Sequence, residues 1–300
     1  YSSASYCFGA NVKYSSLLYT LESPSFENYN RTISEMQANI TSMSRKLDNF
    51  TIRTITDLQA YMIVRDRLEE AGDYLNKSRI SLRHNSSSLQ LNLAFAGERL
   101  QSAVSWASFM GRKGMEFRIS DTELMKSCLN KISEAEERYN YVNYLFRGAM
   151  SDVKDELQSA REAYRNEDHA LCLYEATLAK ARIGVVSSSI GIEEEDLDDL
   201  LQRKLQAAKK SIINQQDSGI YPILSYSYYE YARSLRNRDV YSSLLYAEHA
   251  LELSNMDIYF EPEKASIDTS ESSDALIFFS GMAIGVMLSV LCYTFHSRLK

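Results

Sequence analysis

Residues 165–179 read RNEDHALCLYEATLA, and residues 236–250 read RNRDVYSSLLYAEHA. The two stretches align without a gap at a spacing of 71 residues. In each, a charged turn leads into a helix whose small and apolar residues recur every third position, which places them on one face. The matched pairs are Arg165/Arg236, Asn166/Asn237, Asp168/Asp239, Leu173/Leu244, Ala176/Ala247 and Ala179/Ala250.

A recurring turn and helix with a small-residue face predicts helical hairpins that stack on one another. We therefore expect an all-α fold, with stacked helical hairpins that are tetratricopeptide-like or that form an irregular bundle. The tetratricopeptide signature itself is absent. Three prolines and eleven glycines in 300 residues also favour long helices. Apolar periodicity predicts helices over 1–21, 25–49, 54–80, 87–111, 120–146, 150–165, 168–188, 193–215, 219–236 and 239–256.

The chain opens with YSSASYCFGA, which matches YSSLLYAEHA at 241–250 in five positions. The later copy is the second helix of a predicted hairpin. Because a helix with an apolar face needs a partner to cover it, we expect the first copy to have lost its partner helix. On this interpretation, residues 1–259 are an N-terminally truncated helical domain.

Residues 275–295 read ALIFFSGMAIGVMLSVLCYTF, a stretch without charge that is long enough to cross a bilayer as a helix. Acidic residues precede it, and Arg298 and Lys300 follow it, so the tail is predicted to be cytoplasmic and the main domain to lie outside. We expect an extracytoplasmic helical domain at 1–259 and an acidic Ser-rich stalk at 260–274. A transmembrane helix in the cell membrane at 275–296 and a cytoplasmic tail at 297–300 should follow.

Two further motifs accompany this organisation. Asn-x-Ser/Thr triplets predict glycosylation sites on an extracytoplasmic face, at Asn30, Asn39, Asn49, Asn76 and Asn85. Within the predicted span, Gly281 and Gly285 form a GxxxG motif with Ser289 on the same face. Such small residues let two membrane helices approach closely, so a homo-oligomer is one expected assembly.

The sequence offers no catalytic, cofactor-binding or metal-ligating residues. The four histidines lie in separate segments, and neither a nucleophile elbow nor a glycine-rich phosphate loop is present. The acidic run at 193–199 is expected to be a solvated helix start rather than a calcium site. A net charge of −7 without a basic stripe argues against nucleic-acid binding.

Cysteines and clustered tyrosines leave alternatives open. The cysteines at 7, 128, 172 and 292 are expected to be buried free thiols, and pairing cannot be deduced from their spacing. The tyrosines at 226, 228, 229 and 231 follow helical spacing, which favours packing in the core over a surface for a partner.

The stretch YSSASYCFGANVKYSSLLYTL at 1–21, followed by a long helical region and one C-terminal membrane helix, resembles the C-terminal half of archaeal membrane-anchored Lon-like serine proteases. The resemblance implies an upstream Lon-type domain with a Ser-Lys dyad. No segment of this chain matches that dyad, so no catalytic residue is carried over.

Two functions are therefore expected. The first is a non-catalytic helical scaffold and membrane anchor of a Lon-type serine endopeptidase, with protein or peptide substrates. The alternative is a self-contained, membrane-anchored helical-repeat module that binds proteins through a concave surface. No cofactor is expected in either case, and the lipid bilayer is a partner through 275–296.

Overall fold

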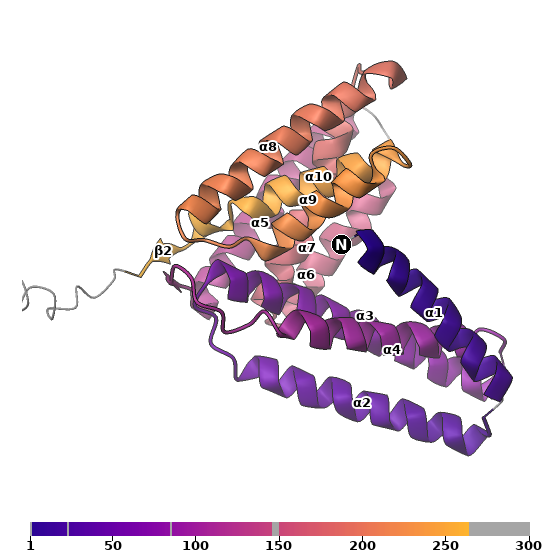
Figure 1. Ribbon diagram of the computed structural model, residues 1–300. Coiled ribbons are helices and arrows are strands. Elements are labelled where there is room, and N and C mark those ends of the chain that lie inside the picture. Colours follow the sequence, from indigo (N-terminus) through magenta and orange to yellow (C-terminus); the bar gives the residue numbers. More distant parts are fainter. Residues whose placement is uncertain (1, 23, 85, 146–149, 264–300) are drawn as a thin grey trace, which may run out of the picture. The chain divides into compact units, whose positions relative to one another are not determined.

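The computed structural model describes residues 2–22, 24–84, 86–145 and 150–263. These residues form ten α-helices (Figure 1), so the all-α prediction is confirmed. The helices are α1 (Ser2–Glu22), α2 (Phe26–Asp48), α3 (Ile55–Arg83), α4 (Leu89–Ala107), α5 (Asp121–Leu145), α6 (Ser151–Arg165), α7 (His169–Ser189), α8 (Leu197–Asp217), α9 (Ile223–Leu235) and α10 (Val240–Ser254).

Short elements that the periodicity did not predict lie at the ends of helices. They are the 3-10 turns η1 (Glu194–Asp196) and η2 (Met256–Tyr259), and the strands β1 (Phe117–Arg118) and β2 (Glu261–Pro262). The two strands pair antiparallel, with Phe117 opposite Pro262. Segments of two residues are too short to show a strand period, so only tertiary pairing reveals them.

Side-chain caps begin several helices where the sequence places them. Ser120 and Glu123 form a capping box: the Glu123 amide donates to Ser120 Oγ at 3.3 Å, and the Ser120 amide donates to the Glu123 carboxylate at 2.9 Å. The repeated aspartates cap the second helices of the two hairpins. Asp168 accepts from the Leu171 amide at 3.1 Å, and Asp239 accepts from the Ser242 amide at 3.0 Å.

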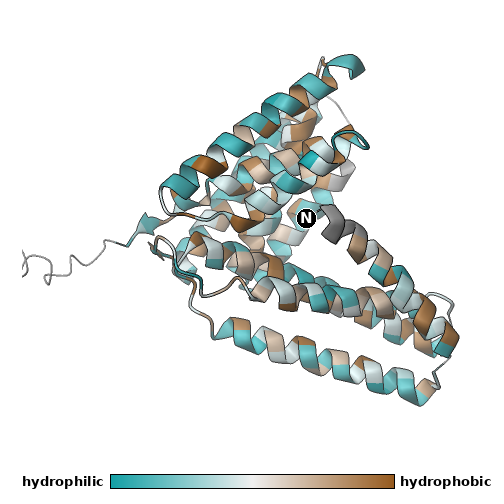
Figure 2. Ribbon diagram, viewed as in Figure 1, coloured by the Kyte–Doolittle hydropathy of each residue, from teal (hydrophilic) through white to brown (hydrophobic). Residues whose placement is uncertain are grey.

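The two similar hairpins are α6–α7 and α9–α10, and their second helices pack against each other. The apolar residues matched between the two repeats are buried in both copies, whereas the matched turn residues are exposed or half-buried. The buried pairs are Leu173/Leu244, Ala176/Ala247 and Ala179/Ala250. Helices α3 and α4 pack together as a third pair, and α1 lies along α4 (Figure 1). Figure 2 shows teal and brown residues alternating along α2 and α8, which present one apolar face each.

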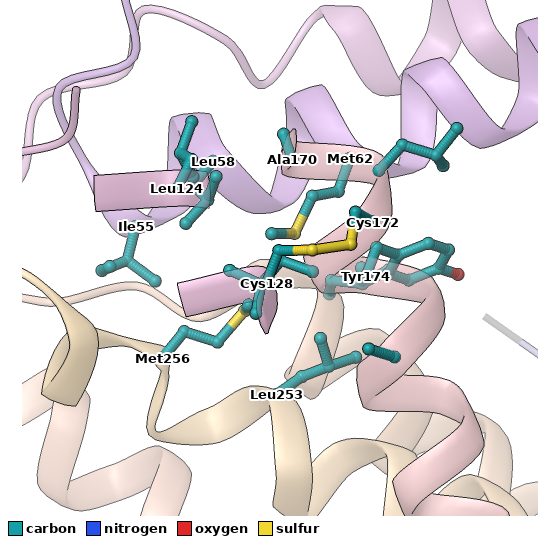
Figure 3. Packing of buried hydrophobic residues seen from close by; sticks show 14 of the residues in the cluster. Ile55, Leu58, Met62, Leu124, Cys128, Ala170, Cys172, Tyr174, Leu253 and Met256 are labelled. Carbon is teal, nitrogen blue, oxygen red and sulfur yellow. A yellow bond between two sulfur atoms is a disulfide. The ribbon is translucent and has the colours of Figure 1, made fainter. Parts of the chain in front are cut away.

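A disulfide joins α5 to α7 at the centre of the largest buried cluster. Cys128 and Cys172 have Cα atoms 5.6 Å apart and no exposed surface. Figure 3 shows this bond among Met62, Leu253 and Met256, with the ring of Tyr174 extending away from it. The prediction of free thiols is therefore wrong for these two residues, because a spacing in sequence does not reveal that α5 and α7 pack together.

The other two cysteines differ from this pair. Cys7 is a free thiol, but it is exposed rather than buried. Cys292 lies outside the described residues.

None of the described helices is long and apolar enough to span a membrane. The predicted membrane helix at 275–296, with Gly281, Gly285 and Ser289, lies outside the described residues, as does most of the predicted stalk. At the start of the predicted stalk, Phe260 is buried in the main cluster and the next two residues form β2. The folded unit thus extends to Pro262.

Candidate functional site: a tyrosine-lined cavity

A cavity of about 480 Å³ opens where α3, α4, α7, α9 and α10 converge. We call it the tyrosine cavity, and define it by its four tyrosines and two further residues from the hairpin helices. These are Tyr174, Glu175, Tyr228, Tyr231, Tyr246 and His249. Its volume lies in the range of ligand pockets, and aromatic walls with a few polar groups are typical of such sites.

The tyrosine rings contact one another across α7, α9 and α10. The hydroxyls of Tyr174 and Tyr228 share a hydrogen bond of 2.7 Å. The ring of Tyr246 stacks on Tyr228 at a centroid distance of 5.7 Å and lies 4.3 Å from Tyr231. Burial raises the pKa of Tyr228 to about 12, so its hydroxyl stays neutral and is available as a hydrogen-bonding group.

A charged network from α3 and α4 forms the opposite wall of the cavity. Arg67 Nη1 lies 2.8 Å from the Asp66 carboxylate and 2.5 Å from that of Glu70. Arg99 Nε lies 2.9 Å from Glu70. Burial raises the pKa of Asp66 to about 6, against the opposing effect of Arg67. The two guanidiniums are thus held by two carboxylates, and this part of the network is electrically balanced.

Two groups in the cavity are left without such partners. Among the described residues, no hydrogen bond or ion pair reaches the Glu175 carboxylate, and burial raises its pKa well above the usual range. His249 is only 6% exposed, and neither ring nitrogen has a hydrogen-bond partner within the part of the chain that the structure describes. Burial, with Arg182 nearby, lowers the pKa of His249 to about 3, so the ring is neutral near pH 7.

A second, larger groove of about 760 Å³ lies between the end of α2, α3 and the start of α7. Its basic side chains are already held by carboxylates. Arg65 binds Asp48 and lies 3.2 Å from Asp168, and His169 Nδ1 lies 2.7 Å from Asp121. The tyrosine cavity is the stronger candidate site because its lining includes a buried ring, His249, whose nitrogens have no hydrogen-bond partner among the described residues.

The predicted glycosylation sites are distributed over two helices. Asn30 and Asn39 lie on α2, Asn49 caps its C-terminus and Asn76 lies on α3, all with exposed side chains. Asn85 lies outside the described residues. These positions remain predictions, since exposure permits a modification without demonstrating it.

The tyrosines that the sequence singled out divide between two roles. Tyr228 and Tyr231 line the cavity, whereas Tyr229 packs in the core beside α8 and Tyr226 is exposed. The acidic run at 193–199 has exposed carboxylates, as expected for a solvated helix start. No group of three or more His, Cys, Asp or Glu side chains in the described ranges is placed to hold a metal ion.

Sequence reasoning missed the cavity itself, although one signal was available. Residues 65–70 read RDRLEE in the middle of α3, directly after the buried run at 55–64. Five charges directly after a mostly buried run need partners, and such a cluster marks a candidate site. Comparisons with protein-family models, with curated proteins and with solved structures found no match for this chain.

Proposed function

We propose that this chain is a membrane-anchored, non-catalytic helical scaffold that binds another polypeptide at its tyrosine cavity. The observation that carries the proposal is the cavity of about 480 Å³, walled by tyrosines and arginines from helices far apart in the sequence. Tyrosine, tryptophan and arginine are the residues enriched at the energetic centres of protein interfaces. The paired hairpins α6–α7 and α9–α10 support a stacked, tetratricopeptide-like arrangement, which builds concave binding surfaces.

The membrane part of the proposal rests on the uncharged sequence at 275–295 and on the charges that flank it. The Cys128–Cys172 disulfide supports placing the helical domain outside the cytoplasm. Disulfides form and persist in oxidising compartments, with the intracellular proteins of hyperthermophiles as the main exception. The GxxxG motif at Gly281 and Gly285 supports a homo-oligomer formed through the membrane helix.

The finer proposal is that this scaffold belongs to a Lon-like serine endopeptidase whose proteolytic domain lies upstream. Its support is the resemblance at 1–21 and the order of helical region and anchor. An exposed apolar face on α1 also supports it, because a further segment would cover that face. The side chains of Tyr14, Leu17 and Leu21 are 64%, 54% and 71% exposed.

The protease proposal is tested by the intact mass and N-terminal sequence of the native protein extracted from its membrane. A chain well above 34.3 kDa, with a Ser-Lys proteolytic domain before Tyr1, is the expected result. A native mass near 34.3 kDa would contradict the protease proposal and leave the self-contained binding module.

The scaffold proposal is tested by a photo-crosslinking amino acid placed at Tyr231 in the cavity, in native membranes. The matched control carries the same amino acid at Tyr144 on α5, which is 79% exposed and does not line the cavity. We expect one discrete polypeptide adduct at 231, identified by mass spectrometry, that is absent at 144. No adduct at 231, or the same adducts at both positions, would overturn the scaffold proposal.

A further inference from the structure

The acidic and basic side chains that line the tyrosine cavity are not matched one to one. The guanidiniums of Arg67 and Arg99 are offset by the carboxylates of Asp66 and Glu70. The remaining carboxylate is that of Glu175, which no cation among the described residues pairs with. Burial and the neighbouring acids raise the pKa of Glu175, which favours its protonated form, and a ligand cation beside the carboxyl would favour the ionised form instead.

The groups around Glu175 add to this imbalance. Its carboxylate feels four further acids, namely Asp66, Glu156, Glu69 and Glu70. Arg182, on the same helix, is paired with another acid, since its Nε donates to Glu156 at 2.7 Å. These acids therefore favour a cation beside Glu175, whereas Arg182 opposes a positive charge on the His249 ring itself.

His249 is an independent sign that the cavity takes a polar ligand. Its ring is more than nine-tenths buried and lines the cavity, with both nitrogens unpartnered within the described part of the chain. It makes T-shaped ring contacts with Tyr228 and Tyr246, at centroid distances of 5.0 and 5.7 Å. A neutral imidazole presents one lone pair, which accepts a hydrogen bond from an N–H donor.

The tyrosine rings supply the remaining element of a cation site. Tyr228, Tyr231 and Tyr246 form a connected aromatic wall beside these polar groups. The negative face of an aromatic ring attracts ammonium and guanidinium groups, and desolvation strengthens this attraction. Carboxylate, lone pair and aromatic faces together match an organic N–H cation. They do not match a bare metal ion, for which the described residues offer no ligand cluster.

We propose that the tyrosine cavity binds an ammonium or guanidinium group carried by a lysine or arginine side chain of a partner polypeptide. Glu175 pairs with the charge, His249 accepts one N–H, and the tyrosine rings enclose the alkyl stem and the cationic head. This inference rests on the proposed scaffold function and gives its binding site a ligand chemistry.

The test measures binding by calorimetry, with the full chain in non-ionic detergent. The probes are Nα-acetyl-lysine methylamide, its uncharged analogue Nα-acetyl-norleucine methylamide, and an acetylated pentapeptide with a central lysine. We expect the lysine probe and the peptide to bind and the norleucine probe not to bind. Glu175→Gln should weaken binding of the lysine probe by about tenfold or more, the effect of a lost charge-assisted contact.

Two further variants keep the result interpretable. Glu137→Gln removes the same charge from an exposed position on α5 that does not line the cavity, and it should bind as the wild type does. Tyr246→Leu removes one ring and should weaken binding of the lysine probe several-fold without changing the helical content. Equal affinity of the wild type and Glu175→Gln, or equal affinity for charged and uncharged probes, would overturn the cation site.

Binding of the acetylated pentapeptide decides whether the cation comes from a polypeptide. Binding of the lysine probe without binding of the peptide would overturn the assignment to a polypeptide and point to a free small amine. The crosslink at 231 separates this inference from the scaffold function. If the adduct persists while none of the lysine probes bind, the scaffold function stands and the cation site fails.

Discussion

Replacing the buried histidine of the cavity should change how stability depends on pH. The pKa of His249 is about 3 in the folded chain, against 6.5 for an ordinary histidine, because burial and Arg182 disfavour the imidazolium. Between these two values the unfolded chain binds more protons than the folded chain. The contribution of His249 is therefore fully present above pH 6.5 and is lost as the pH falls toward 3.

This shift sets the magnitude of the effect. Between about pH 7.5 and about pH 5, a pKa difference of this size lowers the free energy of unfolding by about 2 kcal/mol. His249→Leu removes the titration. It also removes two buried nitrogens that have no hydrogen-bond partner among the described residues, so the variant should be at least as stable as the wild type at neutral pH. On acidification, His249→Leu should keep about 2 kcal/mol of unfolding free energy that the wild type loses through the titration of His249.

Asp66 provides a matched control because its shifted pKa changes the stability with pH in the opposite direction. Its pKa is raised from 3.8 to about 6, chiefly by burial, so the folded chain binds the proton more tightly. Its contribution is present at low pH and is lost as the pH rises from 3.8 to 6. At about pH 5, protonation of Asp66 offsets about 1 kcal/mol of the unfolding free energy that the titration of His249 removes. Asp66→Asn should therefore steepen the loss of stability on acidification, whereas His249→Leu should reverse it.

The assay is urea unfolding followed by far-ultraviolet circular dichroism, on the full chain in non-ionic detergent at the two pH values. For each variant we compare the unfolding free energy at the two pH values. Taking this difference removes the part of each substitution's effect that does not depend on pH. If the wild type and His249→Leu changed by the same amount, the histidine would already be solvated or partnered. The description of the cavity would then be wrong.

Three further predictions concern the scaffold. Replacing Cys128 and Cys172 together by alanine should lower the free energy of unfolding by about 4 kcal/mol, because the disulfide no longer restricts a loop of 44 residues in the unfolded chain. Reductant should cause the same loss in the wild type and should leave the stability of the double variant unchanged. Asp168→Ala and Asp239→Ala should each cost about 1 kcal/mol for the lost helix cap, and Asp168→Ala should cost more because it also removes one of the two ion pairs of Arg65. Equal costs in thermal unfolding would contradict the Arg65–Asp168 ion pair. Ala176→Leu and Ala247→Leu should each cost about 1–3 kcal/mol by overpacking a fully buried helix contact, and unchanged melting temperatures would show that these faces are open.

Much of the fold could be predicted because its causes are local. The helix at 121–145 begins at a capping box that is readable in the sequence, and few prolines or glycines interrupt the chain. The repeat at 165 and 236 predicted both charged turns and both buried faces, since a helix presents every third or fourth residue to the same side. That Asp168 and Asp239 cap the two helices was shown by the structure. The two short strands were missed, because their pairing joins residues far apart in the chain.

The candidate site was the part that local patterns did not disclose. Its arginines and two of its carboxylates come from α3 and α4, and Glu175 comes from α7. Its tyrosines come from α7, α9 and α10, and its histidine comes from α10. The sequence contained the charged stretch RDRLEE and the tyrosine cluster after Pro222, but nothing in it indicated that they face each other.

By itself, the sequence determined the all-α class, the positions of the helices and the two related hairpins, because periodicity and caps act within one or two turns. Only the tertiary structure decided that Cys128 pairs with Cys172, that Glu175 stays unpaired and that His249 is buried without a partner. Bonding, burial and pKa depend on which helices pack together. That packing is set by contacts between residues that are distant along the chain.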